Sequence, residues 1–214
     1  MLFSALATTA TLIYFLRRTR IGKIFLDVPT ARGLHVTPVP RIGGIAIFAS
    51  VWLLAGMWMQ RDLVAGIAGL SLVLVTISLL DDLRPLSAVL RLLVHTGAAI
   101  LVLLLWVNTF GLSSTRASAS IGWVSSPPVA IALAVALMLA IVWMTNLYNF
   151  MDGADGLAGG MSVIGFGSYA IALGVLPNSG GSLGLLVAAL TGAAAGFLIF
   201  HQPKFLWETP AQFH

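Results

Sequence analysis

Seven long runs of apolar residues, separated by short polar segments, set the pattern along this chain. Each run approaches the roughly 20 residues that a helix needs to cross a bilayer. Because backbone groups cannot stay unpaired in hydrocarbon, each run is predicted to be a helix. The predicted fold class is therefore all-α, a polytopic transmembrane bundle of about seven spans. These spans are Met1–Leu16, Ile42–Met59, Leu63–Leu80, Leu86–Val107, Pro127–Thr145, Leu157–Leu176 and Ser182–Phe200.

The composition supports a membrane protein and excludes several other classes. Of the 214 residues, 59% are hydrophobic and 8% are charged, whereas soluble proteins carry roughly 25% charged residues. So few charges cannot cover a water-soluble surface, and the apolar content excludes intrinsic disorder. The absence of cysteine excludes disulfides, zinc–thiolate sites and cysteine nucleophiles. The net charge of +4 does not indicate nucleic-acid binding, because the basic residues follow the membrane topology.

The basic residues divide unequally between the two sets of loops that alternate along seven spans. Only Arg61 and Arg116 lie in one set. The positive-inside rule assigns the richer set to the cytoplasm, so the N-terminus is predicted outside and the first span is an anchor rather than a signal peptide. The residues assigned to the cytoplasmic side are Arg17, Arg18, Arg20, Lys23, Arg32, Arg41, Arg84, Arg91 and Lys204.

The acidic residues gather on the same predicted face, with only Asp62 lying opposite. Acidic residues have little influence on topology, so this bias is independent of the rule that sets the orientation. It predicts one site on the inner face, assembled from several loops. The residues that would surround this site are Asp27, Asp81, Asp82, Asp152, Asp155 and Glu208.

The pair Asp81-Asp82 ends the third apolar run. Ionised carboxylates at a membrane boundary are costly unless they are paired, hydrated or bound to metal. Adjacent carboxylates can hold Mg²⁺, or one can act as a base while the other binds the metal. The alternative is a solvated helix end with Asp82 close to Arg84, and the sequence leaves both interpretations open.

The stretch from Asn146 to Gly160 contains the most specific motif of the chain. Asn146, Asn149 and Asp152 recur every three residues, so a continuing helix would carry them on roughly one face. Asp155 follows, and glycines then lead into the next span, where backbone N–H groups can bind an anion. The pattern fits neither an EF-hand nor a Walker A loop. It predicts amides that hold a base or sugar and carboxylates that hold a metal ion; the alternative is a polar inner loop.

The first inner loop, residues 27–44, combines prolines with basic residues and a histidine. The prolines stiffen the backbone, and Arg32, His35 and Arg41 can offer charge or hydrogen bonds to a phosphate. The alternative is positive-inside anchoring, which accounts for the basic residues between Arg17 and Lys23 but not for the histidine and proline pattern.

Two further features lie on predicted helices. Arg91 and His95 are one turn apart after Pro85, so Arg91 could meet a lipid phosphate while His95 is predicted to be a packed, hydrogen-bonded histidine. Gly192 and Gly196 form a small-xxx-small pattern that predicts close packing between helices.

These segments, in this order and on one predicted face, resemble the polyprenyl-phosphate N-acetylhexosamine-1-phosphate transferases, glycosyltransferase family 4, which include the phospho-N-acetylmuramoyl-pentapeptide transferases. The resemblance runs from about Asp27 to His201. It rests on the first loop, on Asp81-Asp82 and on Asn146-x-x-Asn149-x-x-Asp152-Gly-x-Asp155-Gly. The form Tyr-Asn-Phe-Met-Asp-Gly is closest to members that initiate O-antigen and lipopolysaccharide synthesis. Gly33 stands where many members carry Lys.

The resemblance implies transfer of N-acetylhexosamine 1-phosphate from a UDP-sugar to undecaprenyl phosphate, with release of UMP. This step would initiate cell-envelope polysaccharide synthesis, of the O-antigen or peptidoglycan type, in the bacterial cytoplasmic (inner) membrane. The implied cofactor is Mg²⁺, and membrane lipid, but not nucleic acid, is an implied partner. By the same resemblance, Asp81 is the base or a metal-side carboxylate, and Asp82 assists it and binds metal with Asp152. The implied substrate or nucleotide contacts are Asn146, Asn149, Asp155, Arg32, His35 and Arg91.

The C-terminal part departs from the family pattern. Family members have ten or eleven spans and a later motif close to Phe-Met-Gly-Asp-[Ala/Thr/Val]-Gly-Ser, whose Asp is a metal ligand. Residues 201–214 stand where that motif is due. Back-translation of this stretch in another frame can yield Ile-Phe-Met-Gly-Asp-Ala-Gly-Ser, which suggests the hypothesis of a one-base slip. We therefore expect residues 1–200 to be an incomplete transmembrane transferase domain, residues 201–214 to be an aberrant cytoplasmic tail, and catalysis by this chain to be impaired.

Two alternatives to an active transferase remain open from the sequence. One is an inactive truncated fragment of such an enzyme. The other is an ion-coupled membrane transporter, since carboxylates in membrane proteins often serve ion pathways. A transporter would place its acids near mid-bilayer within broken helices, whereas the acids of this chain lie at predicted span ends.

Overall fold

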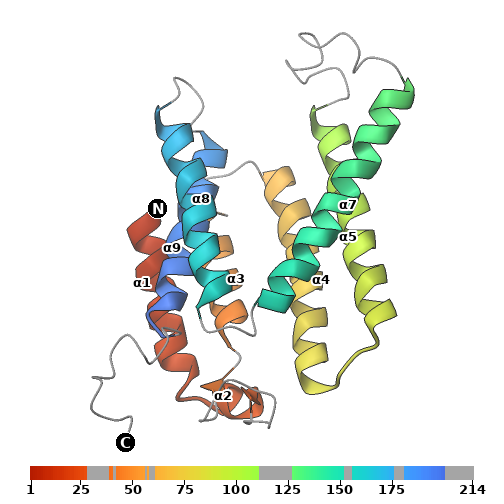
Figure 1. Ribbon diagram of the computed structural model, residues 1–214. Coiled ribbons are helices and arrows are strands. Elements are labelled where there is room, and N and C mark those ends of the chain that lie inside the picture. The colour runs from red at the N-terminus through yellow and green to blue at the C-terminus, as the bar shows by residue number, and fades with distance from the viewer. Residues whose placement is uncertain are drawn as a thin grey trace, which may run out of the picture. The chain divides into compact units, whose positions relative to one another are not determined.

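Helices make up nearly all of the described structure. The computed structural model describes residues 1–27, 39–40, 42–55, 57, 61–110, 127–151, 156–175 and 181–200. Its helices are α1 (Leu2–Leu16), α2 (Arg20–Ile24), α3 (Gly43–Ala55), α4 (Arg61–Leu83), α5 (Ala88–Phe110), α7 (Pro127–Met151), α8 (Leu157–Val175) and α9 (Ser182–Leu198) (Figure 1).

Each of the seven predicted spans coincides with a helix. Among the described residues, α4, α5, α7 and α8 are long and apolar enough to cross a membrane, and α1, α3 and α9 are shorter apolar helices. The prediction of an all-α, multi-pass membrane protein is therefore confirmed. Several boundaries differ by a few residues, and the largest differences are at α3, which ends at Ala55, and at α7, which continues to Met151.

Two short strands join the helices. β1 (Leu26–Asp27) pairs with β2 (Val39–Pro40) in an antiparallel register that sets Leu26 opposite Pro40. The apolar pattern gives no sign of this pairing, because two residues are too few to show an alternation. The pairing does not change the fold class.

The chain divides into two compact units. The first unit comprises Met1–Arg61 with Phe150–His214, and the second comprises Asp62–Asn149. The second unit is therefore inserted, in sequence, between the two parts of the first. The described helices of the first unit are α1, α2, α3, α8 and α9, and the second contains α4, α5 and most of α7.

The first unit is held together around α9, which packs against α1, α3 and α8. Its small residues allow this, because Gly192 and Gly196 lie against the backbone of α1 at the carbonyl oxygens of Leu2 and Leu6. The predicted close packing at this small-xxx-small motif is thus confirmed, and α1 is its partner. The buried apolar cluster of the unit consists of Ala5, Val51, Ala189 and Ala193.

A buried polar contact joins α1 to α3 in the same unit. The hydroxyl groups of Thr9 and Ser50 are 2.5 Å apart and form a hydrogen bond. Both residues are completely buried. Ser50 Oγ also donates to the carbonyl oxygen of Ile47 at 3.1 Å. These polar groups are satisfied inside the bundle, as an apolar surrounding requires.

Candidate functional site

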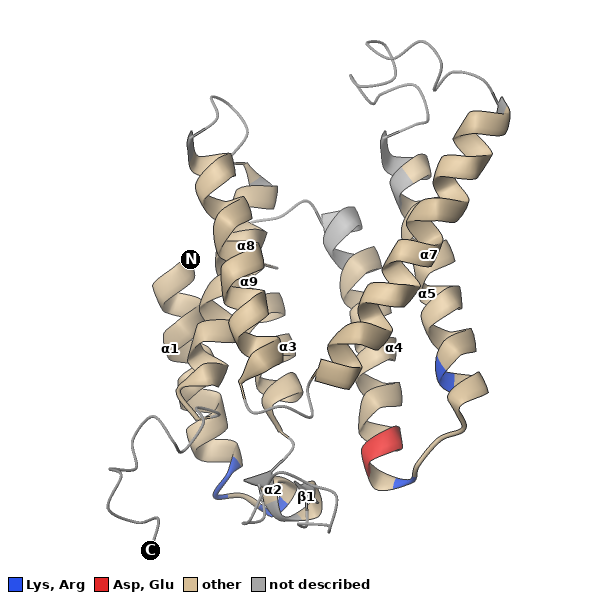
Figure 2. Ribbon diagram, viewed as in Figure 1, with Lys and Arg blue, Asp and Glu red and all other residues tan. Residues whose placement is uncertain are grey.

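Asp81 makes two hydrogen bonds across the turn between α4 and α5 in the second unit. Its Oδ1 accepts a hydrogen bond of 2.7 Å from the backbone N–H of Leu86. Its Oδ2 accepts one of 3.1 Å from Nη1 of Arg91, which is also an ion pair. Both oxygens of one carboxylate therefore bind groups at the start of α5. Figure 2 shows this charged end of the α4–α5 hairpin.

The ion pair between Asp81 and Arg91 lies partly in solvent. The side chains of Arg91 and Asp81 are 36% and 23% exposed, respectively. Water and salt screen such a pair, so its own contribution to stability is about 1 kcal/mol or less. The charge-assisted bond from the Leu86 N–H adds to it. Asp82, the next residue, is exposed, so the described ion pair uses the aspartate nearer the helix interior.

Asn146 and Asn149 lie on the last turns of α7, which continues to Met151. The prediction that a helix carries this spacing is confirmed as far as Asn149. Asn146 Nδ2 donates to the carbonyl oxygen of Val142 at 2.8 Å. Both asparagines are exposed, so their remaining amide groups are accessible for a polar ligand.

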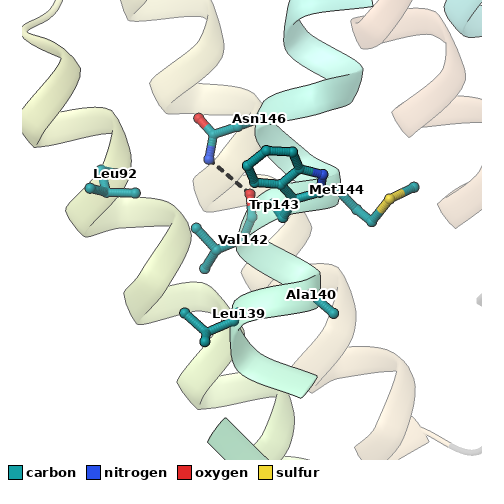
Figure 3. Close-up of a pocket in the computed structure, with 7 residues that line it drawn as sticks. All are labelled: Leu92, Leu139, Ala140, Val142, Trp143, Met144 and Asn146. Atoms are coloured by element: carbon teal, nitrogen blue, oxygen red, sulfur yellow. Dashed lines mark hydrogen bonds between the residues drawn. The ribbon is translucent and has the colours of Figure 1, made fainter. Parts of the chain in front are cut away.

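An apolar groove joins the beginning of α5 to the end of α7. Its volume is about 740 Å³, and Asn146 lies at one end of it (Figure 3). Leu92, which follows Arg91 in the chain, lies on the α5 side. The groove therefore links Asn146 to the residue that follows Arg91 in the chain. The lining residues are Leu92, Leu139, Ala140, Val142, Trp143, Met144 and Asn146.

Several predicted site residues lie outside the described residues. These are Arg32, His35, Asp152 and Asp155, and their roles stay predictions. Asp27 lies in β1, but only its backbone is described. Of the predicted site residues, the structure brings Asp81 and Arg91 into contact.

The donor groups at this end of the second unit suit Mg²⁺. The described residues contain no group of three or more His, Asp or Glu side chains that could hold a metal ion. Mg²⁺ is usually held by one or two carboxylates together with substrate phosphates and waters. Asp82 is an exposed carboxylate, and the oxygens of Asp81 each keep a lone pair beside their hydrogen bonds. Two hard oxygen donors at a helix end therefore fit this ion.

Two groups near the site, the backbone N–H of Leu86 and the side chain of Trp143, are not predicted from the sequence. The Leu86 N–H has no sequence signal, because any non-proline residue supplies a backbone donor. Trp143 precedes Asn146 by three residues, a helical spacing that could have placed it in the groove.

His95 is half-buried, and its Nδ1 is buried without a hydrogen-bond partner among the described residues. The expectation of a packed histidine holds, but the expectation of a hydrogen bond is wrong for Nδ1.

Comparison with known proteins gives consistent matches. The model of the glycosyl transferase family 4 matches residues 64–206. The chain is 32% identical to a probable undecaprenyl-phosphate N-acetylglucosaminyl 1-phosphate transferase of Bacillus subtilis, over 98% of this chain and 58% of that protein. It is 30% identical to a decaprenyl-phosphate N-acetylglucosaminephosphotransferase of Mycobacterium tuberculosis, over 92% of this chain and 53% of that protein.

A third relative comes from Escherichia coli O157:H7. It is an undecaprenyl-phosphate alpha-N-acetylglucosaminyl 1-phosphate transferase that is 28% identical over 80% of this chain and 46% of its own length. The chain thus spans about half the length of the curated relatives it matches. No solved structure matches it significantly.

Proposed function

The chain belongs to glycosyl transferase family 4, and from that premise we propose that it transfers N-acetylglucosamine 1-phosphate from a UDP-linked donor to a polyprenyl phosphate. The names of its relatives support the sugar and the lipid acceptor. The structural observation that carries the proposal is the ion pair of Asp81 with Arg91, beside the exposed Asp82, at the α4–α5 turn of the second unit.

The reaction is a phosphoryl transfer. An oxygen of the lipid phosphate attacks the sugar-linked phosphorus of the donor. The bond from that phosphorus to the UMP oxygen breaks, and UMP leaves. Such reactions depend chiefly on positioning and on neutralising the charge of the phosphates. A cation, carboxylates and amides at a helix end can provide both.

The residues of the second unit divide these tasks by their chemistry. Arg91 is a permanent cation with planar donors, and it is held in place by Asp81. It would bind a phosphate oxygen of the lipid. The exposed amides of Asn146 and Asn149 would bind the sugar or the base of the donor. Asp82, with Asp81, would hold Mg²⁺, which supplies positive charge to the phosphates.

We also propose that this site faces the cytoplasm of a bacterial inner membrane. The distribution of basic residues supports this orientation. A chain without cysteine allows a direct test, because a single introduced cysteine is the sole labelling site. We expect cysteines placed at Arg61 and Arg116 to react with an impermeant maleimide added outside cells. A cysteine at Arg84 should react only after lysis, and the reverse pattern would contradict the orientation.

The activity is tested in a chimera that contains the part of a relative that this chain does not match. Residues 1–200 of this chain are joined to the remainder of the Bacillus subtilis relative, which matches 98% of this chain. Membranes that contain this chimera receive Mg²⁺, undecaprenyl phosphate and UDP-N-acetylglucosamine. We expect release of UMP together with a sugar-bearing lipid. The 214-residue chain is assayed in parallel.

The parent enzyme from Bacillus subtilis is the positive control. If the parent releases UMP and the chimera does not, at equal amounts in the membrane, the proposal fails. UDP-N-acetylgalactosamine and UDP-N-acetylmuramoyl-pentapeptide serve as competing donors. Turnover of either in preference to UDP-N-acetylglucosamine would replace the proposed sugar.

A further inference from the structure

Two arginines at the end of α1 stack on aromatic rings. The guanidinium carbon of Arg18 lies 4.0 Å from the centroid of the Tyr14 ring. That of Arg17 lies 5.6 Å from the centroid of the Phe200 ring, which follows α9. Stacking places a guanidinium over the face of the ring and leaves its in-plane N–H groups available. These ring contacts use none of the hydrogen-bond donors of the two cations.

Both arginines are exposed and make no ion pair with any described residue. The turn that carries them is itself fixed, because the hydroxyl of Thr19 donates to the carbonyl oxygen of Leu16 at 2.8 Å. A guanidinium group has five N–H donors and no acceptor. A ligand for this pair must therefore accept hydrogen bonds and carry negative charge.

The pair is expected at the membrane surface, because Arg17, Arg18 and Arg20 directly follow the apolar residues of α1. With 15 residues, α1 is about 22 Å long at 1.5 Å per residue, which is shorter than the hydrocarbon core of roughly 30 Å. Side chains at the end of such a helix extend toward the headgroups, or the bilayer thins to meet them. Tyr14 and Phe200 suit the same level, where aromatic rings concentrate.

We infer that Arg17 and Arg18 form a binding site for the headgroup of an anionic phospholipid. A phosphodiester accepts paired hydrogen bonds from guanidinium groups. An anionic headgroup such as phosphatidylglycerol keeps its net charge, whereas a zwitterionic headgroup brings a cation that the two arginines would repel. The site lies in the first unit, uses none of the residues assigned to the transferase reaction, and does not depend on the proposed function.

The test measures lipid retention by the full chain. The protein is reconstituted in phosphatidylcholine bilayers with a minor fraction of phosphatidylglycerol, extracted in mild detergent and examined by native mass spectrometry. We expect retained phosphatidylglycerol in the unmodified protein. The double variant Arg17→Gln with Arg18→Gln should bind on the order of 10-fold less, because each basic residue near the lipid surface contributes separately.

Two matched variants separate a defined site from general charge. Arg61→Gln with Arg116→Gln removes the same charge elsewhere and should retain phosphatidylglycerol; equal loss in this pair would overturn the site. Arg17→Lys with Arg18→Lys keeps the charge and should fall between the unmodified protein and the glutamine variant. Retention by the lysine variant equal to that of the unmodified protein would overturn the stacked geometry.

Two further measurements complete the test. One distinguishes binding of a lipid from binding of a soluble anion, and the other distinguishes loss of the binding site from unfolding of the variant. Inorganic phosphate is added to the detergent extract and should not displace the lipid, since a soluble anion lacks the membrane anchor. Displacement by phosphate would overturn the assignment to a lipid. Thermal unfolding is measured for each variant, and loss of lipid at an unchanged melting temperature supports the site. Loss that occurs only in unfolded protein would overturn it.

Discussion

The two units of the molecule use different means to hold helices together. In the first unit, small residues bring backbones into contact, as at Gly192 and Gly196 against α1. Among the described residues, every buried apolar side chain belongs to this unit except Ala99. In the second unit, α4, α5 and α7 expose large apolar side chains over most of their length. Among the described residues, α4 is joined to the start of α5 by the hydrogen bonds of Asp81 with Leu86 and Arg91.

This difference follows from the solvent. Lipid is as apolar as leucine, so large side chains gain little by leaving it, and helices associate where small residues permit close contact. The first unit has such residues on α9 and is packed. The second unit has few buried residues and carries Asp81, Asp82, Arg91 and the two asparagines. Among the described residues, close packing thus lies in the first unit, and the Asp81–Arg91 ion pair lies in the second.

The largest expected effect comes from removing carboxylates of the proposed site. In the chimera, Asp81→Asn and Asp152→Asn should each lower UMP release by roughly 10²–10⁴-fold, the contribution typical of a general base or its partner. Asp62→Asn is the matched control, because Asp62 lies on the same helix as Asp81 but at its opposite end. UMP release by this control should be unchanged. Near-normal release by Asp81→Asn would remove that residue from the mechanism.

The next effect concerns the packing of the first unit. A methyl group at Gly192 would overlap the carbonyl oxygen of Leu2, which belongs to the backbone and cannot rotate away. Gly192→Ala should therefore lower the stability of the unit by roughly 1–3 kcal/mol, measured by thermal unfolding in detergent. Gly165→Ala on α8 is the control, because nothing lies within 4 Å of the added methyl group. Equal melting of both variants would contradict the proposed contact.

A smaller effect is expected in the second unit. Arg91→Gln removes the ion pair but leaves the bond from the Leu86 N–H to Asp81. Combined with Asp81→Asn, it should show a coupling energy of about 1 kcal/mol or less, because the pair is partly solvated. The measurement is a double-mutant cycle of unfolding free energies. Additive effects of the two substitutions would show that the pair does not stabilise the hairpin.

The smallest effect concerns the buried hydroxyl pair of the first unit. Thr9→Val keeps the shape of the side chain and removes the hydrogen bond to Ser50. Hydrogen bonds between membrane helices contribute about 0.6 kcal/mol on average. We expect a loss of this size in unfolding free energy, and a smaller loss when Ser50→Ala is added to Thr9→Val than when it is made alone, because Ser50 Oγ also donates to the carbonyl oxygen of Ile47. An effect larger than that of Gly192→Ala would reverse the ranking of packing over hydrogen bonding.

The sequence predicts the helices well because their cause is local. Each apolar run is long enough to indicate a lipid environment, in which the backbone must form a helix. All seven predicted spans coincide with helices. The continuation of α7 through Asn149 follows from a spacing that is visible in the residues themselves. The end of α3 at Ala55 is less predictable, since the run of apolar residues continues beyond it.

The contacts between helices could not be predicted, because they join residues distant in the chain. The small-residue motif on α9 indicates close packing but does not indicate α1 as its partner. The ion pair of Asp81 with Arg91 joins two helices across a turn, and the sequence alone gives no sign of which residues this turn brings together. The roles of Asp152 and Asp155 stay predictions from sequence.

The contact of α9 with α1 also has a consequence in time. Gly192 meets Leu2, so this contact cannot form until residue 192 has been synthesised. At about 5–20 residues per second, α1 waits on the order of 10–40 s for its main partner, while the second unit is synthesised. During that interval α3, which packs against α1 and shares the Thr9–Ser50 bond with it, is already present. The order of synthesis therefore lets α1 meet α3 before it meets α9.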